Sequence, residues 1–268
     1  SAVLLIALMG FLGGGSRLDD LISMLQGYAY HHDLAEMWHR HVVRDVAFMV
    51  AMFVCAVAMF LEEFFRVEGP YGLVDYLHAV VTVIVFAVLM LGFTFLLYVL
   101  RILIVTVDVF CYQSVQHPNI SEATESWNIL QALLRKASTA VELGLLITLA
   151  LAALTVPAFV LDHAELGSYL ETFRNLLPYI LIEFGVLRVF VVAAAVTDKC
   201  LRVPALINSL SFGIGAERDR QHLVEYIVHS AAGFYICDVR ITLGMVTKFI
   251  YVWSVILFSF AGRELTTQ

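Results

Sequence analysis

Apolar runs of helix length alternate along the chain with shorter polar connections. An α-helix needs about 20 apolar residues to cross the hydrocarbon core, whereas the strands of an outer-membrane barrel are segments of about ten residues with alternating polarity. The pattern therefore predicts an all-α integral membrane protein. The predicted spanning segments are 1–13, 43–65, 74–111, 138–161, 173–198 and 240–262.

Two of these runs are longer than a bilayer requires. The run that begins at Val74 continues to about His117 without a Gly-Pro break, and the run that begins at 173 continues through Cys200 into "VPALINSLSFGIG". We expect both helices to project from the membrane on one side.

The polar segment 112–137 has the pattern of an amphipathic helix. Acidic residues follow Pro118 and basic residues come near its end, which is the order that the helix dipole favours. Its apolar residues Trp127, Leu130 and Leu134 recur at intervals of three and four, so they share one face. Because no helix breaker follows, this helix should run directly into the next spanning segment.

The segment 217–230 shows a similar stripe, in which Leu223 and Ile227 stand beside charged residues. We expect these extensions to assemble into a cytoplasmic anchor domain made of helices.

The composition agrees with this assignment to the membrane. The 268 residues are 61% hydrophobic and 15% charged, whereas a soluble domain is about half apolar and a quarter charged. The net charge of −7 disfavours nucleic acid as a partner. We therefore expect a multi-pass protein of the cell membrane that contacts lipid and binds no nucleic acid.

Basic residues concentrate in alternate connections. The connections 13–42, 112–137 and 199–240 carry Lys and Arg, whereas 62–73 and 162–172 are poor in them. Since basic loops stay in the cytoplasm, we expect the C-terminus outside and the long extensions inside. If the last predicted span, 240–262, is counted as the seventh helix, the opening segment 1–13 becomes the second. We therefore expect a seven-helix bundle whose first helix is missing from this sequence.

Cysteines and histidines do not indicate an enzyme. The four cysteines lack CxxC spacing, and the histidines of "HHDLAEMWHRH" are not repeated in boxes on other segments, as a metal site would require. We interpret these histidines as a solvated cluster in a loop. No Ser/His/Asp arrangement or phosphate loop is visible, so we expect no catalytic activity, no cofactor and no metal.

The C-terminal sequence "DRQHLVEYIVHSAAGFYICDVRITLGMVTKFIYVWSVILFSF", with its long helical extensions, resembles the insect chemoreceptor superfamily, specifically gustatory-receptor-like (GRL) seven-transmembrane channels. In "IYVWSVILF", Tyr251 and Phe258 fit the family pattern, while Ile250 and Leu257 replace its Thr and Gln. The resemblance implies a homotetrameric, ligand-gated, non-selective cation channel. It also implies a split last helix, whose first half lies in the anchor and whose second half lines the pore.

Several residues of the last helix are candidates for the pore. Thr247, Tyr251, Ser254 and Phe258 follow one another at intervals of three and four, so they share one face. Hydroxylated side chains suit a wet pore, and Leu257 or Phe258 would form a hydrophobic gate. Close packing of helices through small and hydroxylated residues explains the same pattern. The pore and gate set is Thr247, Tyr251, Ser254, Val255, Leu257 and Phe258.

Charges within the apolar runs give further candidates. Arg101, Asp108 and Glu142 fall toward the cytoplasmic side, where we expect pairing within the anchor. Glu183 lies nearer the outside and either contacts an unknown small-molecule ligand or pairs with Arg188. The resemblance implies a ligand pocket in the outer bundle, and its candidate residues are Phe60, Tyr76, Tyr179 and Glu183.

The stretch "GFYICDVR" is a polar break between an amphipathic helix and the last apolar run. We expect a hinge here, with Gly233 freeing the backbone and with Asp238 and Arg240 at the membrane interface. The hinge and anchor candidates are Trp127, Gly233, Phe234, Asp238 and Arg240.

The expected division places spanning helices two to four in 1–111 and helices five and six in 138–198. The anchor helix is 112–137, the anchor and hinge are 199–239, and the pore-lining helix is 240–262. Two other functions remain open: a multi-helix transporter with Glu183 and Arg188 as coupling residues, and a non-conducting scaffold of the same fold.

Overall fold

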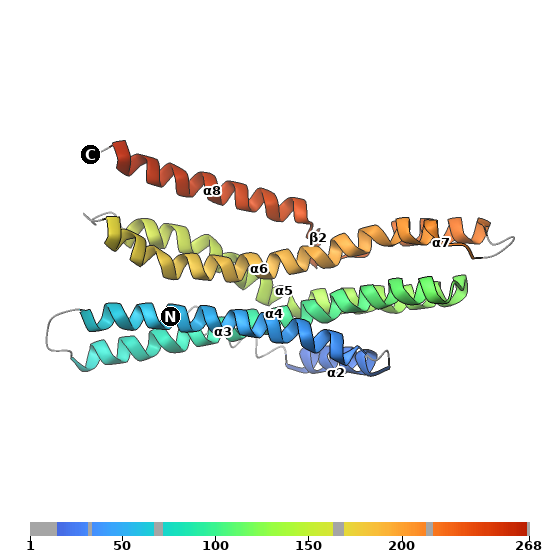
Figure 1. The fold of residues 1–268 in the computed structure, drawn as a ribbon, viewed down its shortest axis with the longest axis horizontal. Coiled ribbons are helices and arrows are strands. Elements are labelled where there is room, and N and C mark those ends of the chain that lie inside the picture. Colours follow the sequence, from blue (N-terminus) through green and yellow to red (C-terminus); the bar gives the residue numbers. More distant parts are fainter. Residues whose placement is uncertain (1–14, 32–33, 67–71, 163–168, 213–216, 267–268) are drawn as a thin grey trace. The chain divides into compact units, whose positions relative to one another are not determined.

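The computed structural model describes residues 15–31, 34–66, 72–162, 169–212 and 217–266, and its description of side chains does not extend to 15–19, 29, 31, 35, 63, 66, 156–178 and 256–266. The described chain is almost entirely helical (Figure 1). Its elements are α2 (Gly15–His31), α3 (Ala35–Arg66), α4 (Leu73–Gln116), α5 (Ile120–Asp162), α6 (Tyr169–Ser209), α7 (Glu217–His229), β1 (Tyr235–Ile236), β2 (Val239–Arg240) and α8 (Leu243–Thr266).

Four helices are long and apolar enough to cross a membrane, so the chain has the character of a multi-pass membrane protein. Their candidate spans are Glu36–Glu62, Leu73–Gln116, Ile120–Thr155 and Tyr179–Ser209. Within the described residues, α8 adds the shorter apolar stretch Leu243–Val255. The predicted span 1–13 lies outside the described residues.

The prediction of helices longer than a bilayer is confirmed. Helices α4, α5 and α6 contain 44, 43 and 41 residues. At a rise of about 1.5 Å per residue each is about 60 Å long, or twice the hydrocarbon thickness of about 30 Å. The predicted continuity of the amphipathic segment with the span that follows it is also observed, because both belong to α5.

The N-terminus of α5 shows why the helix begins where it does. The side-chain oxygen of Asn119 accepts a hydrogen bond from the backbone N–H of Ser121 at 3.1 Å, and its amide nitrogen donates to Glu122 at 2.9 Å. Asn119 is therefore the N-cap, and the carboxylate in the first turn complements the helix dipole.

The region 13–42, expected to be a connection, is largely helical. Helix α2 occupies part of it, and α3 begins at Ala35, ahead of the predicted start at 43. Leu21 and Leu25 lie one turn apart on α2 and both are buried. An amphipathic helix of this kind has too few apolar residues to register as a span, so hydropathy alone missed it.

The chain divides into two compact units. The first contains residues 1–106 and 136–189, and the second contains 107–135 and 190–268. In the first unit the Trp38 ring of α3 lies against the Tyr98 ring of α4, with centroids 4.6 Å apart and the planes tilted by 46°. Lys136 of α5 also pairs with Asp20 of α2 at 3.7 Å.

The second unit contains the end of α4, the start of α5, the end of α6, and α7 and α8. Trp127 is fully buried, with its ring 5.2 Å from that of Phe110. Its Nε1 donates a hydrogen bond to Ser230 Oγ at 3.0 Å, which joins α5 to the residue after α7. The segments that we expect to form the anchor lie in this unit. Its cytoplasmic location remains a prediction.

A close approach of α4 and α6 in the first unit depends on Gly185. A Cβ at this position would lie 2.7 Å from Cε2 of the buried Phe93, well inside van der Waals contact. By contrast, a Cβ at Gly92 would meet no other atom within 4 Å.

We predict that Gly185→Ala lowers the free energy of unfolding by about 1–3 kcal/mol, because the Phe93 ring would be forced aside. Gly92→Ala on α4 is the matched control and should leave stability unchanged or slightly higher. Unfolding of both variants in mild detergent, followed by circular dichroism, measures the difference. Equal stabilities would contradict the close contact.

Candidate functional site

The last helix, α8, was expected to line a pore, and most of its described side chains are exposed, with Val246 the one that is buried. Tyr251 is 70% exposed and Thr247 is also exposed, whereas Val246 on the opposite face is 4% exposed. Ser254 is half-buried, and Val255 is exposed. The gate residues Leu257 and Phe258 lie outside the residues whose side chains are described. The structure thus places Thr247 and Tyr251 together on a free face of an apolar helix.

The hydroxyl groups of this helix are satisfied locally. Thr247 Oγ1 donates to the carbonyl of Leu243 and Ser254 Oγ donates to that of Ile250, each at 2.9 Å. Such bonds to the preceding turn lower the cost of placing a hydroxyl in an apolar environment. Each oxygen keeps lone pairs that can accept a hydrogen bond from water or solvate a cation.

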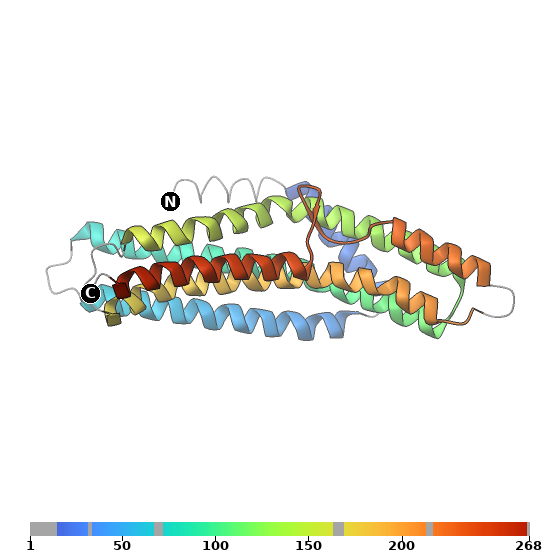
Figure 2. The same ribbon diagram turned by 90° about the horizontal axis from the view of Figure 1, so that it is seen from above.

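The expected hinge is a folded hairpin. Strands β1 and β2 pair antiparallel, with Tyr235 opposite Arg240 and Ile236 opposite Val239. The two residues between them, Cys237 and Asp238, have φ angles of 47° and 61°. Positive φ at both central positions is typical of the tight type I′ turn. Figure 2 shows this hairpin in the connection between α7 and α8.

The hairpin is fixed to α6. The backbone N–H of the fully buried Phe234 donates to Thr197 Oγ1 at 2.9 Å. Arg240 donates to the carbonyl of Ala232, which closes the loop before β1. Asp238 is exposed at the turn.

The hinge role expected for Gly233 stays a prediction. Its backbone is not in the left-handed region, so no unusual φ requires glycine at this position. Its importance is steric: a Cβ would lie 2.8 Å from Nε of Arg240 and 3.3 Å from the side chain of Thr197. Glycine is needed here because two side chains pack against its backbone.

We predict that Thr197→Val lowers the free energy of unfolding by about 1–3 kcal/mol, because the buried N–H of Phe234 would lose its acceptor. The matched control is Thr106→Val. Thr106 is equally buried, but its hydroxyl bonds only to a carbonyl of its own helix, that of Ile102, at 2.8 Å. Thermal unfolding in detergent compares the two. A cost as large at Thr106 would contradict the assigned role.

The expected ligand-pocket residues make separate contacts. The Tyr76 ring lies 5.8 Å from that of Phe64 on α3. Glu183 on α6 is half-buried and accepts a hydrogen bond from Thr155 of α5. Neither contact joins its residue to another member of the set. Phe60 and Tyr179 are also half-buried. A shared pocket remains a prediction.

The alternative pairing of Glu183 with Arg188 is wrong. The two residues are five positions apart on α6, so they point to different sides of the helix. Glu183 bonds to Thr155, and Arg188 bonds to Asp45.

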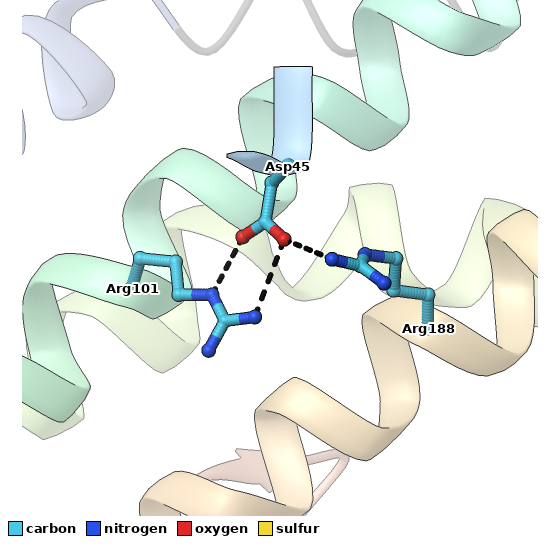
Figure 3. A network of polar contacts seen from close by, with 3 residues as sticks. All are labelled: Asp45, Arg101 and Arg188. Carbon is cyan, nitrogen blue, oxygen red and sulfur yellow. Dashed lines mark hydrogen bonds and ion pairs between the residues drawn. The ribbon is translucent and has the colours of Figure 1, made fainter. Parts of the chain in front are cut away.

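Asp45 is the centre of a charge cluster that the sequence analysis missed (Figure 3). It lies on α3 and is 2% exposed. Arg101 of α4 donates from Nε to Oδ2 at 2.6 Å and from Nη2 to Oδ1 at 3.3 Å, and Arg188 of α6 donates from Nη2 to Oδ1. The Arg188 guanidinium carbon also lies 4.3 Å from the centroid of the Phe48 ring. Three helices thus meet at one carboxylate.

The pairing expected for Arg101 therefore occurs, but in the first unit rather than among the anchor segments. Asp108 does pair within the second unit, with Lys199 of α6. The signal that could have revealed this cluster is an acidic residue near the start of one apolar run together with arginines within two other runs.

Among the described residues, no three potential metal ligands come together, and His31 and His32 lie outside the described side chains. No known protein-family model matches the chain, and comparison with characterised proteins finds no relative. The resemblance to chemoreceptors therefore rests on the residues of α7, the hairpin and α8.

Proposed function

We propose that the chain is a subunit of a homotetrameric, ligand-gated, non-selective cation channel of the cell membrane. The last helix, α8, of each copy would stand beside a central pore. The observation that carries this proposal is the exposed face of α8 formed by Thr247 and Tyr251.

The composition of this face favours a polar neighbour over lipid alone. Exposed apolar side chains such as Val252, at 54%, suit contact with lipid tails or with another apolar helix. A threonine and a tyrosine one turn apart give the exposed side a row of oxygen atoms. Rings of such groups, contributed by several copies, line pores in which ions are partly hydrated.

The base of α8 is held in place, which a gating helix requires. The hairpin before it is fixed to α6 through Thr197, and the first turn of α8 is capped by the carbonyl of Thr242, which accepts from the N–H of Met245 at 3.0 Å. Movement of α8 would then occur mainly toward its other end, where Leu257 and Phe258 would form a hydrophobic gate.

A ligand opens such a channel only if it binds the open state more tightly than the closed state. We place its pocket near Glu183, whose carboxylate is half-buried and suits a cationic or hydrogen-bonding ligand. Phe60, Tyr76 and Tyr179 are the aromatic candidates for the lining of this pocket.

A non-conducting scaffold of the same fold is the second candidate. It is favoured by the internal hydrogen bonds of Thr247 and Ser254, since hydroxyls bonded to their own helix also suit dry packing between helices. The scaffold is also favoured by Leu257, which stands where the gustatory-receptor-like pattern has a polar Gln.

The oligomeric state provides the first test. Single-particle imaging of the purified protein should show four copies related by a four-fold axis that passes beside α8. A monomer would rule the channel out.

The second test is chemical access to the proposed pore face. In a background with the exposed Cys55 and Cys237 replaced by serine, a cationic thiol reagent should block most of the leak current of Thr247→Cys and Tyr251→Cys. Val246→Cys, on the buried face, is the matched control and should be insensitive. A tetramer whose current ignores the reagent at 247 and 251 would favour the scaffold.

The gate has its own test. Leu257→Ala and Phe258→Ala should raise the leak current, because smaller side chains weaken a barrier that depends on dewetting. Val252→Ala serves as the control on a different side of α8. Unchanged current in both gate variants would remove the gate assignment.

A further inference from the structure

The Asp45 cluster contains one more positive charge than negative. It joins two guanidinium groups, those of Arg101 and Arg188, to a single carboxylate. Within the described part of the chain, the polar contacts recorded for these residues are only those that they make with one another. The cluster therefore has a net charge of +1.

That charge belongs to helices that are candidates to cross a membrane. Asp45, Arg101 and Arg188 fall within the candidate spans Glu36–Glu62, Leu73–Gln116 and Tyr179–Ser209. An uncompensated charge in such segments is strongly unfavourable, and a guanidinium does not relieve the cost by losing its proton. An external anion would complete the neutralisation.

The two arginines are not equivalent in their remaining hydrogen-bonding capacity. Figure 3 shows Arg101 facing Asp45 with two nitrogens and Arg188 with one. The Arg188 Nε is buried and has no acceptor among the described residues, although 26% of the Arg188 side chain is exposed, against 15% for Arg101. Phe48 supports the face of the Arg188 guanidinium. Arg188 is thus an oriented donor with unused N–H groups beside an accessible surface.

We propose that this cluster binds a phosphate monoanion at Arg188, supplied either by the headgroup of an acidic phospholipid or by free phosphate. Two N–H groups of one guanidinium match two oxygens of a phosphate, and the bound charge brings the cluster to neutrality. The inference does not depend on the proposed channel function, because it uses only contacts within α3, α4 and α6.

The test varies the charge of the cluster. Arg188→Gln leaves a neutral pair of Asp45 and Arg101, whereas Asp45→Asn raises the net charge to +2. The melting temperature of each purified protein in neutral detergent is measured as phosphatidylglycerol, phosphatidylcholine or sodium phosphate is added, with sodium chloride matching ionic strength. Arg202→Gln, at an exposed position farther along α6, is the matched control.

For the wild type and for Arg202→Gln, phosphatidylglycerol or sodium phosphate should raise the melting temperature, while phosphatidylcholine and chloride should not. In Arg188→Gln the anion should bind at least about tenfold more weakly, the equivalent of about 1.4 kcal/mol. Asp45→Asn should melt lower without anion and gain more from its addition. A response to the lipid alone identifies a headgroup site, and a response to free phosphate identifies a soluble oxyanion site.

Equal anion responses in wild type and Arg188→Gln would overturn the proposal, as would a wild type that responds to neither anion. If Arg188→Gln does not fold, native mass spectrometry of the wild type decides the question. The site is supported if the wild type retains phosphatidylglycerol in preference to phosphatidylcholine and if Arg188→Lys loses this preference. Equal retention of the two lipids, together with the absence of a bound phosphate when the protein is sprayed with phosphate, overturns it.

Discussion

The backbone of a membrane-spanning segment must satisfy its own hydrogen bonds, because hydrocarbon offers no partner for an N–H or a carbonyl. This constraint explains why α4, α5 and α6 run without interruption for more than 40 residues each. The chain departs from continuous helix between α7 and α8, and there the hairpin satisfies its backbone by pairing its strands and by using Thr197 and Arg240 as partners. Between α7 and α8 the irregular backbone therefore lies where side chains can satisfy its hydrogen bonds.

The same low-polarity environment governs the charges. Arginine and aspartate within apolar runs persist because they meet: Asp45 receives both Arg101 and Arg188, and Asp108 receives Lys199. Breaking a buried pair is far more costly than the net gain from forming it, so such clusters specify which helices are neighbours. In this chain the buried Asp45 links α3, α4 and α6 in the first unit, whereas the more exposed pair of Asp108 and Lys199 links α4 and α6 in the second.

The two units carry different parts of the proposed function. The first contains the charge cluster and Glu183, where a ligand or an anion would act. The second contains the buried Trp127, the hairpin and α8, where a ring of copies would open or close. Helices α4, α5 and α6 each contribute residues to both units.

The sequence by itself determined the long apolar helices and their character, although it missed α2. Apolar runs and the amphipathic stripe of Trp127, Leu130 and Leu134 are local patterns with a period set by the helix, so length and continuity followed from them. Only the tertiary structure decided the partners. Glu183 bonds to Thr155 rather than to Arg188, Gly233 is required by its neighbours rather than by its own φ, and Asp45 lies between two arginines distant in sequence. Periodicity reports which residues share a face, whereas which face meets which helix depends on packing that no single segment encodes.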